Sequence, residues 1–332
     1  MEDLLKYAEE LSRKVDSFIY ETVKGTPQVL YDAALHYIKA GGKRLRPVVV
    51  ALSTRIAGGN ENIAIPGAAA VEVLHTFTLI HDDIIDKDEV RRGVPTVHRI
   101  WGIDTAIVAG DLLYAYAYKC LLKALELGVP SINVAKALSF LTEAAITVAE
   151  GQALDMILPS KSEADVKDYI DMVSKKTAAL FAFSAKIGAV LAGAQQDLMD
   201  KLFNVMMNAG IAFQIKDDIL GLIGDERVLG KPVYSDLREG KMTILVIYAL
   251  KNLEQVKREK LLKVLGNRSA TMDEFREAAK LIIDSGALEY AQSLAKTYAE
   301  RAIEALNTLS AQDAKALNMF KELVLYMIER AK

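Results

Sequence analysis

Apolar residues recur three and four positions apart along most of the chain. The pattern is clearest in residues 4–23, 115–128, 132–157 and 275–309, where Ala, Leu, Lys and Glu fill many of the other positions. This spacing predicts amphipathic α-helices, and these residue types are strong helix formers. No segment keeps a period of two between turn signals, so we expect strands to be absent or trivial.

Glycine and proline interrupt the helical pattern at short intervals. The clearest breaks are Gly25-Thr26-Pro27, Gly41-Gly42, Gly58-Gly59-Asn60, Arg92-Gly93-Val94-Pro95, Gly128-Val129-Pro130 and Gly230-Lys231-Pro232. They cut the chain into about ten or more helices. None of the connections is long enough, or rich enough in Ser and Pro, to be an interdomain linker. We therefore expect one all-α domain over residues 1–332.

The segment most like a membrane span is Thr177–Ala194, TAALFAFSAKIGAVLAGA, with Lys186 at its middle. A spanning helix needs about 20 mainly apolar residues, and a central charge is costly there. A buried core helix is the better interpretation. The first residues, MEDLLKYAEELSRKV, lack the basic and apolar regions of a secretory signal. We expect a soluble, cytoplasmic protein.

Composition changes this picture mainly by exclusion. The chain has 52% hydrophobic and 26% charged residues and a net charge of −3, so it is neither disordered nor generally attracted to nucleic acid or anionic lipid. Cys120 is the only cysteine, which excludes an intramolecular disulfide, and its apolar surroundings favour an inert buried thiol. The four histidines lack the spacing of a zinc site.

The strongest chemical signal is the acidic sequence HDDIID, residues 81–86. Asp82 and Asp86 are four positions apart, so in a helix their carboxylates share one face, about 6 Å apart along the axis. Like charges at this spacing destabilise a helix unless a cation neutralises them. Such oxygen ligands suit Mg2+, which commonly bridges carboxylates to substrate phosphates. The alternative is a solvated acidic helix end.

A second acidic pair, Asp217-Asp218, lies inside the apolar pattern IAFQIKDDILGLI. Together the two pairs imply shared divalent metal ions. Basic residues gather at the breaks in the helical pattern, namely Lys43, Arg44, Arg46, Arg91, Arg92, Lys175, Lys176, Lys231 and Lys241. Metal ions and cations in this combination indicate a phosphorylated polyanion as the substrate.

These ingredients favour one reaction. Metals and cations around a diphosphate lower the cost of its departure as an anion. A pocket built from Ala, Leu, Ile and Phe holds no strong nucleophile to trap the carbocation, so a bound alkene attacks it instead. The signatures of acyl transfer, NTP hydrolysis and hydride transfer are missing. We expect ionisation and condensation of an allylic diphosphate.

The ordered motifs resemble those of the trans-type isoprenyl diphosphate synthases, and most of all the archaeal-type geranylgeranyl diphosphate synthases. The resemblance runs from GGKRLRP through HDDIIDKDEVRRG, GIDTAIVAGD, EGQALD, SKKTAALF and FQIKDDILG to LGKPVYSDLREGKMT. It implies an all-α bundle of the isoprenoid-synthase type around a central apolar cavity, usually a homodimer. It also implies three Mg2+ ions per active site, with Mn2+ as an alternative ion. The implied reaction condenses isopentenyl diphosphate with dimethylallyl, geranyl and farnesyl diphosphates to all-trans geranylgeranyl diphosphate.

The resemblance further implies roles for single residues. The metal ligands are matched by Asp82, Asp86, Asp217 and Asp218. The positions that bind isopentenyl diphosphate are Lys43, Arg46, His75 and Arg92. Those on the side of the allylic diphosphate are Arg91, Lys176, Thr177, Gln214, Lys231 and Lys241. Catalysis is expected from Asp82, Asp86, Lys176, Asp217 and Lys231, and the released diphosphate takes the final proton.

The second acidic motif departs from the family's common DDxxD because its last position is Gly221. Glycine has no side chain to ligate a metal, and Asp225 would need a specific loop to do so. Asp217 is therefore the chief expected ligand of the third ion, and Asp218 ranks behind it.

Phe77 is the expected determinant of product length. It lies five residues before Asp82, about 7.5 Å nearer the helix start, where bulk limits chain extension in short-chain members of the family. A helical wheel puts it about 140° from Asp82, so ordinary core packing is the alternative. Phe77 followed by Thr78 resembles the geranylgeranyl pattern, and farnesyl diphosphate is the nearest rival product.

Two other functions stay open at this stage. A terpene cyclase also uses a DDxxD motif, but it needs no isopentenyl diphosphate site, and the cluster of Lys43, Arg46 and Arg92 argues against it. A noncatalytic prenyl-diphosphate-binding subunit would lose acidic or basic positions, and only Gly221 hints at such a loss.

Overall fold

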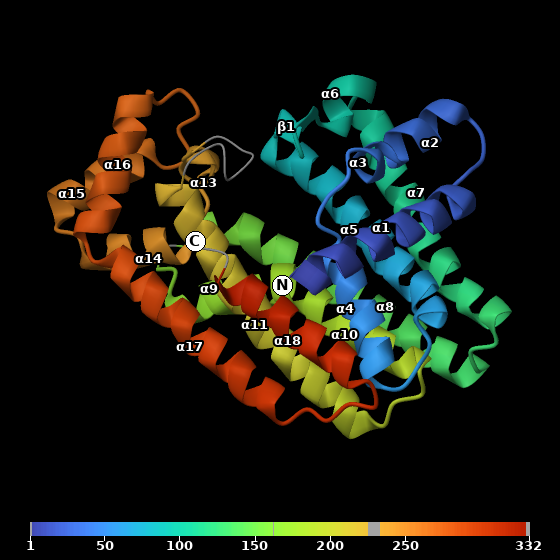
Figure 1. The fold of residues 1–332 in the computed structure, drawn as a ribbon. Helices are drawn as coiled ribbons and strands as arrows, with labels where there is room; N and C mark the ends of the chain where they lie inside the picture. Colours follow the sequence, from blue (N-terminus) through green and yellow to red (C-terminus); the bar gives the residue numbers. More distant parts are fainter. Residues whose placement is uncertain (1, 162, 225–232, 330–332) are drawn as a thin grey trace. The chain divides into compact units, whose positions relative to one another are not determined.

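The computed structural model describes residues 2–161, 163–224 and 233–329, and helices make up nearly all of their regular structure (Figure 1). The elements of the first half are α1 (Glu2–Thr22), α2 (Gln28–Ala34), α3 (His36–Lys39), α4 (Leu45–Ile56), α5 (Glu61–Asp86), β1 (Val90–Arg91), β2 (Val94–Pro95), α6 (Val97–Trp101), α7 (Ile103–Leu122), η1 (Lys123–Leu127), α8 (Ser131–Ile157) and η2 (Leu158–Ser160). The second half contains α9 (Val166–Val173), η3 (Ser174–Ala178), α10 (Ala179–Leu191), α11 (Gln196–Ile223), α13 (Ser235–Glu239), α14 (Ile244–Asn252), α15 (Gln255–Val264), α16 (Met272–Asp284), α17 (Ala287–Asn307) and α18 (Ala314–Glu329). The all-α prediction, with more than ten helices, is confirmed for the described residues.

The internal contacts of the chain divide it into two compact units. Unit 1 consists of Met1–Ile146, Leu180–Met206 and Ala305–Leu325. Unit 2 consists of Thr147–Ala179, Met207–Glu304 and Tyr326–Lys332. The single domain over residues 1–332 that the sequence indicates stays a prediction.

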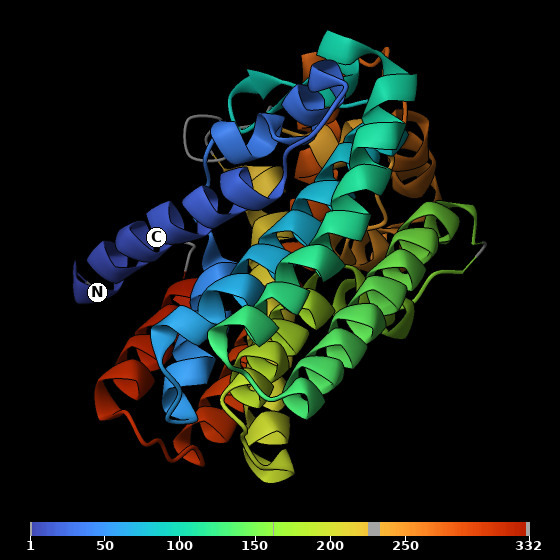
Figure 2. The same ribbon diagram turned by 90° about the vertical axis from the view of Figure 1, so that its right-hand side faces the viewer.

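Helix α5 is the helix around which unit 1 packs. It contacts α1, α4 and α7, and it lies beside α7 over much of its length (Figure 2). Asn60 starts the helix by accepting the backbone N–H of Asn62 with its side chain. Its middle is buried because small and branched apolar side chains face the neighbouring helices, among them Ala64, Ala68, Ala69, Ala70, Val71, Val73 and Leu74. Left-handed Lys87 ends it, so HDDIID forms the last residues of α5.

The two strands form one short hairpin after α5. Val90 pairs with Pro95 and Arg91 with Val94. Arg92 and Gly93 make the turn with φ angles of 53° and 75°, both in the left-handed region that a tight two-residue hairpin turn needs. Arginine rarely adopts this conformation, so contacts of its side chain must hold it there. Trivial strands, as predicted, are found in the described residues.

Helix α7 carries both buried and exposed apolar side chains. One face packs against α5 and α2 and includes Cys120, whose thiol is buried. Burial raises the pKa of this thiol to about 12, which confirms the prediction of an inert cysteine. Elsewhere on the helix, large apolar side chains are at least 38% exposed, namely Ile103, Ile107, Val108, Tyr114 and Leu122.

Helix α10 is the segment that the sequence identifies as most like a membrane span. It is only 13 residues long, and most of its side chains are buried in the protein, so the prediction of a core helix is confirmed. Lys186 reaches out of this core. Its Nζ lies 2.8 Å from Asp200 Oδ1 and over the rings of Phe140 and Phe203.

Two other helical segments in the described residues are long and apolar enough to cross a membrane. They are α5 and the continuous helical segment Ser131–Ser160, which consists of α8 and η2. The apolar stretch of α5 is 67% buried inside the protein, and that of the second segment 33%. Core helices of ordinary proteins share these properties, so this is weak evidence for a membrane span.

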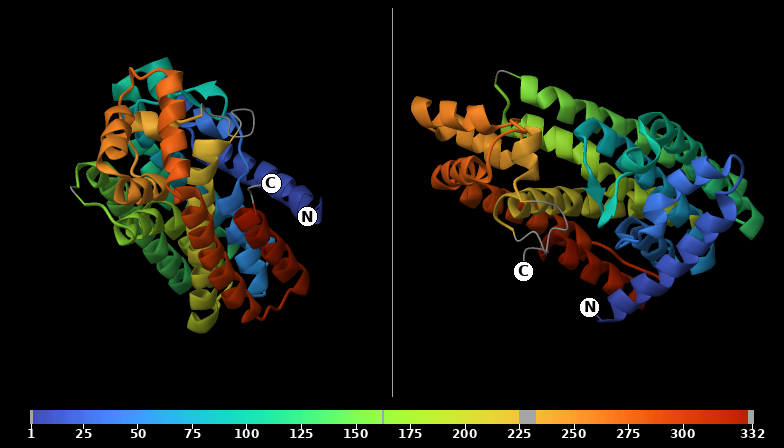
Figure 3. Two further views of the ribbon diagram at one scale, coloured as in Figure 1. Left: turned by 90° about the vertical axis from the view of Figure 1, so that its left-hand side faces the viewer. Right: turned by 90° about the horizontal axis from the view of Figure 1, so that it is seen from above.

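The core of unit 2 is assembled from α9, α11, α14 and α16. Its largest fully buried side chains include Tyr169 and Phe275, and α15 and α16 lie side by side (Figure 3). Asp165 and Asp168 form a capping box at the start of α9. This helix passes into the π-helical turn η3, which carries the SKKT motif. Turns of this kind are rare and are often found at functional sites.

The contact between α4 and α10 in unit 1 yields a test of the fold. The Thr54 hydroxyl donates to the carbonyl oxygens of Val50 (3.0 Å) and Gly188 (2.8 Å). A Cβ on Gly188 would lie 2.1 Å from the Val50 oxygen, so Gly188→Ala must separate the two backbones. A Cβ on Gly67 in α5 would meet side-chain methyl groups and no backbone atom, the nearest being Leu191 Cδ1 at 2.8 Å and Ile187 Cγ2 at 3.1 Å.

We therefore expect Gly188→Ala to lower the midpoint of thermal unfolding by roughly 5 °C or more. Gly67→Ala should lower it by less than half as much. Both substitutions gain the same helix propensity of about 1 kcal/mol, so their difference isolates the backbone contact. Differential scanning calorimetry measures both midpoints, and equal values would contradict the close packing at Gly188.

Candidate active site

The first acidic motif lies at the carboxyl-terminal end of α5. Asp82 and Asp86 are partly exposed, whereas Asp83 is buried. Asp83 accepts hydrogen bonds from the Tyr37 hydroxyl and from Arg91 Nε. Burial raises the pKa of Asp83 to about 6, although Arg91 and Tyr37 act in the opposite direction. Asp83 is thus bound into the protein, and the carboxylates that reach solvent are those of Asp82 and Asp86.

The position of these carboxylates favours a bound cation. The last carbonyl groups of a helix act as about half a negative charge, so aspartates there are unfavourable unless a cation is near. Mg2+ suits such a place because it is commonly bound by one or two carboxylates together with water and substrate phosphates. In the described ranges, no three His, Cys, Asp or Glu side chains gather into a complete metal site. A carboxylate pair completed by a phosphate needs no third residue, so the donor chemistry fits Mg2+.

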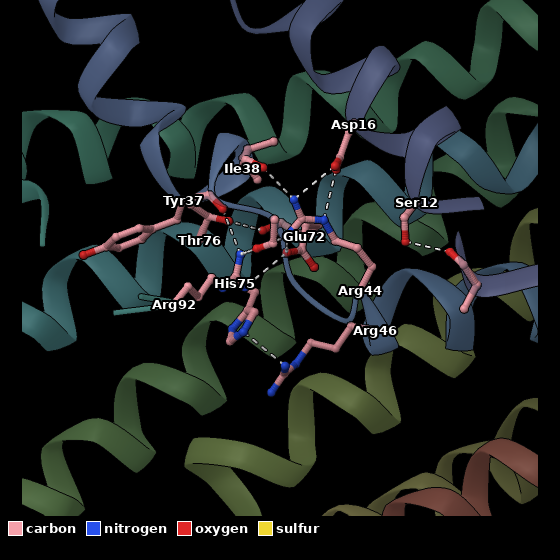
Figure 4. Close-up of polar contacts among 12 residues, drawn as sticks. Ser12, Asp16, Tyr37, Ile38, Arg44, Arg46, Glu72, His75, Thr76 and Arg92 are labelled. Carbon is pink, nitrogen blue, oxygen red and sulfur yellow. Dashed lines mark hydrogen bonds and ion pairs between the residues drawn. The ribbon is translucent and has the colours of Figure 1, made fainter. Parts of the chain in front are cut away.

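The GGKRLRP loop separates its three cations. Lys43 is exposed, whereas Arg44 is only 3% exposed and has a left-handed φ of 47°. All five N–H groups of Arg44 form hydrogen bonds (Figure 4). Its Nε and Nη2 donate to the Asp16 carboxylate at 3.0 and 3.2 Å, and Nη2 also donates to the Ile38 carbonyl at 2.9 Å. Its Nη1 donates to Glu72 Oε1 at 2.9 Å and to the Gly41 carbonyl at 3.2 Å. Arg44 therefore has no N–H group left to donate to a phosphate.

Arg46 is held quite differently. Its Nη1 lies 3.2 Å from His75 Nε2, and its guanidinium carbon lies 4.1 Å from the centre of the Phe181 ring (Figure 4). Its Nε is buried and has no hydrogen-bond partner. Burial lowers the pKa of Arg46 to about 10, which still leaves it charged at neutral pH. A buried, charged donor without an acceptor suits an anionic ligand.

His75 is neutral in this surrounding. Burial lowers its pKa well below the usual value, and the nearby charges of Arg46, Arg92, Arg91 and Arg44 lower it further. Its Nε2 can therefore accept from Arg46.

Arg92 joins the same group from the hairpin turn. Its Nη1 donates to the carbonyls of Tyr37 (2.9 Å) and Gly41 (2.7 Å), and its Nη2 lies 3.5 Å from Glu72 Oε1. The structure thus brings Arg46, His75 and Arg92 together in unit 1, as the sequence leads us to expect. The residues that bind these cations, Tyr37, Glu72 and Asp16, lie outside the sequence motifs.

In unit 2, a buried carboxylate holds two of the expected lysines. Asp155 is 7% exposed, and its Oδ2 lies 2.6 Å from Lys176 Nζ and 2.8 Å from Lys241 Nζ. Burial would raise the pKa of Asp155, but the two ammonium groups lower it below the usual value. In the sequence, Asp155 is recognisable only as part of EGQALD, with no role that follows from that motif. A stronger signal is Gly151 in that motif, where a Cβ would lie 2.2 Å from the backbone nitrogen of Lys176.

Lys175 does not join this group. Its Nζ lies 3.3 Å from Glu150 Oε2 and 3.6 Å from Asp171 Oδ2, and both of these carboxylates are more than half exposed. Adjacent lysines thus differ in role: Lys176 reaches the buried Asp155, whereas Lys175 forms surface ion pairs, which contribute little to stability.

The second acidic motif is partly occupied by protein donors. Gln214 accepts from the Thr177 hydroxyl at 2.9 Å and donates to Asp218 Oδ1 at 2.8 Å, while the Tyr169 hydroxyl donates to Asp218 Oδ2 at 2.7 Å. Burial raises the pKa of Asp218, and the charge of Asp236 raises it further. Both carboxylate oxygens of Asp218 are engaged, whereas Asp217 is partly exposed. The ranking of Asp217 before Asp218 as a metal ligand stays a prediction.

Gly221 leaves room for another carboxylate. A Cβ at Gly221 would lie 2.9 Å from Asp236 Oδ2, and the Gly221 carbonyl accepts the backbone N–H of Tyr234 at 3.2 Å. The segment that begins α13 therefore packs directly on the glycine. The carboxylate of Asp236, from the SDL sequence, therefore lies beside the motif position that Gly221 occupies. Asp225 and Lys231 lie outside the described residues.

Phe77 lies in an aromatic cluster between α5 and α7. Its ring is 4.9 Å from that of His81 and 5.4 Å from that of Tyr114, both edge to face. Tyr114 in turn contacts Tyr118, with their hydroxyls 3.1 Å apart. The Thr78 hydroxyl donates to the carbonyl of His75 at 2.8 Å, so it is bound to its own helix.

The neutral state of His75 predicts how stability depends on pH. Its pKa is lower in the folded protein than its unfolded value of about 6.5. The unfolded chain therefore binds the proton more readily, and the associated stability is present above pH 6.5 and is lost as the pH falls below it. Between pH 6.5 and 5.5, the wild type should lose about 1 kcal/mol more of its free energy of unfolding than His75→Gln. Urea unfolding at the two pH values measures this, and parallel losses in both proteins would contradict a neutral His75.

Comparison with known proteins identifies the family. The Polyprenyl synthetase family matches residues 27–282. A geranylfarnesyl diphosphate synthase from Aeropyrum pernix is 49% identical over 96% of this chain and 99% of its own length. A geranylgeranyl diphosphate synthase from Sulfolobus acidocaldarius is 44% identical over 98% of each chain.

Solved structures share the fold. The geranylgeranyl pyrophosphate synthetase from Pyrococcus horikoshii superposes with a TM-score of 0.91 at 40% identity, over 99% of each chain. A geranylgeranyl pyrophosphate synthase from Corynebacterium glutamicum, complexed with isoprenyl diphosphate and magnesium, gives a TM-score of 0.90 at 27% identity, over 98% of this chain and 99% of that one. The chain therefore belongs to the polyprenyl synthetase family and is a prenyltransferase that elongates isoprenyl diphosphates.

Proposed function

We propose that this prenyltransferase is a geranylgeranyl diphosphate synthase. It adds isopentenyl diphosphate in turn to dimethylallyl, geranyl and farnesyl diphosphates and forms the all-trans product. The observation that carries the proposal is the group around Arg46, a buried cation whose Nε lacks a partner beside a neutral His75. Such a group suits the diphosphate of a substrate. The geranylgeranyl diphosphate synthase from Sulfolobus acidocaldarius supports the product.

Unit 1 supplies the isopentenyl diphosphate site in this proposal, through Lys43, Arg46, His75 and Arg92. The start of α4 adds to the attraction, because Arg44 at its amino end provides no side-chain cap. The first backbone N–H groups of α4 and its helix dipole therefore favour an anion. The aromatic face of Phe181 against the planar guanidinium of Arg46 helps to orient that group.

The allylic diphosphate is bound, in the same proposal, by Arg91, Lys176, Thr177, Gln214, Lys231 and Lys241. Enzymes of this family are typically Mg2+-dependent, and we assign the ligands of three ions to Asp82, Asp86, Asp217 and Asp218, with Asp217 before Asp218. When bound, Mg2+ neutralises charge on the departing diphosphate.

Lys176 and Lys241 contribute two positive charges that Asp155 holds in place, and these charges favour departure of the diphosphate anion. The bond between the allylic carbon and oxygen breaks, and the isopentenyl double bond forms the new carbon–carbon bond. A proton then leaves the condensed cation for the released diphosphate. Lys176, Lys231, Asp82, Asp86 and Asp217 are the proposed catalytic residues.

Phe77 sets the product length in this proposal, with Thr78 beside it. Its ring is fixed by His81 and Tyr114, so it cannot swing aside without losing both contacts. The relative from Aeropyrum pernix favours a second candidate, geranylfarnesyl diphosphate, which is one isoprene unit longer. Farnesyl diphosphate, the rival that the sequence leaves open, would require the chain to stop one unit earlier.

We also propose that the protein acts as a cytoplasmic homodimer. The exposed apolar side chains of α7, Ile103, Ile107 and Tyr114, recur at intervals of four and seven residues and so share one helix face. A second copy of the chain would cover them.

Turnover tests the proposed reaction. The purified protein with isopentenyl and farnesyl diphosphates and Mg2+ should release diphosphate and form all-trans geranylgeranyl diphosphate, and removal of the metal by a chelator should stop both. Asp82→Asn should lower kcat/KM by roughly 10²–10³-fold, because it removes a ligand that acts on the leaving group. Binding without release of diphosphate would favour a noncatalytic subunit. A cyclic hydrocarbon formed without isopentenyl diphosphate would favour a terpene cyclase.

Phe77→Ala tests the determinant of product length. Loss of the ring should open space beside Tyr114, so the main product should gain at least one isoprene unit in chromatography of the dephosphorylated products. Phe140→Ala is the matched control, since it removes an aromatic ring that packs on Lys186 in the same unit. Unchanged products from Phe77→Ala would exclude Phe77 as the stop. A wild type that itself makes geranylfarnesyl diphosphate would replace the proposed product and leave the class of enzyme intact.

A further inference from the structure

Glu72 is a buried carboxylate for which neither the sequence motifs nor the reaction has a use. It lies on α5, one turn before His75, and it is 2% exposed. Its Oε1 lies 2.9 Å from Arg44 Nη1 and 3.5 Å from Arg92 Nη2 (Figure 4). A carboxylate is costly to bury unless it is paired and hydrogen bonded. Glu72 meets this condition with two guanidinium groups at once.

The two arginines come from different segments and meet on the same backbone turn. Arg44 lies in the GGKRLRP loop and Arg92 in the hairpin turn. Both donate to the carbonyl oxygen of Gly41, at 3.2 and 2.7 Å. Two like charges this close repel each other, and Glu72 is the carboxylate that pairs with both of them. Asp16 pairs with Arg44 alone.

The backbone at both arginines is strained. Arg44 and Arg92 have φ angles of 47° and 53°, and only two other non-glycine residues among those described, Lys87 and Tyr234, have positive φ. Such conformations persist only where surrounding contacts hold them, and they cluster at functional sites. The contacts present here are those of Glu72, of Asp16 on Arg44, and of the carbonyl groups of Tyr37, Ile38 and Gly41.

We propose that Glu72 is a positioning residue of the isopentenyl diphosphate site. By holding Arg44 and Arg92 together, it fixes the strained turn from Gly41 to Arg44 and with it the directions of Lys43 and Arg46 on either side of Arg44. Glu72 is buried and paired with Arg44 and Arg92, so in this proposal it acts through these arginines and not by contact with the substrate. This inference rests on the proposed function, which assigns Lys43, Arg46 and Arg92 to isopentenyl diphosphate.

The position of Glu72 predicts a selective effect. Glu72→Gln keeps the size of the side chain but removes its charge. Arg92 then loses its ionic partner, whereas Arg44 keeps Asp16. The KM for isopentenyl diphosphate should rise roughly tenfold or more, which is the usual loss for a charged hydrogen bond. The KM for farnesyl diphosphate and kcat should change less than about threefold, because Arg91, the proposed allylic ligand next to Arg92, is held by Asp83 and Asp88 and not by Glu72. Glu72→Asp keeps the charge and should recover part of the affinity.

Three further proteins make the test decisive. Asp16→Asn removes the other carboxylate from Arg44 at a partly exposed position, so it should fold and should raise the KM for isopentenyl diphosphate in the same direction. Asp313→Asn breaks the Arg55–Asp313 ion pair in the same unit and should change neither KM. The wild type establishes the reaction itself. Thermal unfolding shows which variants are folded before the kinetics are compared.

The outcomes separate the inference from the function on which it rests. A wild type without turnover would overturn the proposed function. If the wild type shows turnover, an unchanged KM for isopentenyl diphosphate in folded Glu72→Gln or Asp16→Asn would overturn the role of Glu72. An equal rise in both KM values would do the same, since it indicates general loosening. Calorimetric titration with isopentenyl diphosphate alone gives an independent reading, and weaker binding by Glu72→Gln with unchanged binding by Asp313→Asn supports the proposal.

Discussion

A carboxylate in the middle of an apolar helix is stable only when cations neutralise it, and unit 1 is arranged around this condition. Glu72 lies in the most buried part of α5. The N-terminal helix, the GGKRLRP loop and the hairpin each bring a charged side chain to the network around it, namely Asp16, Arg44 and Arg92. The same constraint recurs at the end of α5, where Asp83 takes Arg91 and Tyr37 as partners. The contacts that neutralise these buried carboxylates therefore also position the cations for an anionic substrate.

Unit 2 solves the same problem with different residues. Asp155 pairs with Lys176 and Lys241, and Asp218 takes neutral donors from Tyr169 and Gln214. The pKa values of the two carboxylates consequently shift in opposite directions, because ammonium groups lower the pKa of Asp155 while burial raises that of Asp218. A buried acid can thus order either cations or hydrogen-bond donors, depending on which neighbours the helices supply.

Much of this arrangement follows from the sequence, and the exceptions have identifiable causes. Helical periodicity suffices to predict that Asp82 and Asp86 share a face, because this relation depends on four consecutive positions only. The inward turn of Arg44 depends on a positive φ and on partners 28 residues away in either direction, neither of which local patterns reveal. The contacts of Asp155 and Asp236 cannot be predicted from local patterns for the same reason. Each lies near a glycine, Gly151 or Gly221, that lets another segment approach closely. Glycines inside helical patterns therefore carry tertiary information that periodicity alone leaves unused.

The π-helical turn at Ser174–Ala178 also bears on the contacts of this segment with α11. A π turn holds one residue more than the α-helical turn that it replaces, since its hydrogen bonds join residues five apart. If the same residues were wound as a regular α-helix, the additional residue would rotate the preceding residues by about 100° relative to those that follow. Tyr169 before the turn and Thr177 within it reach Asp218 and Gln214 on a single helix, α11. They could not both keep these partners after such a rotation. The wide turn is thus what lets this segment hold one residue more while both side chains reach α11.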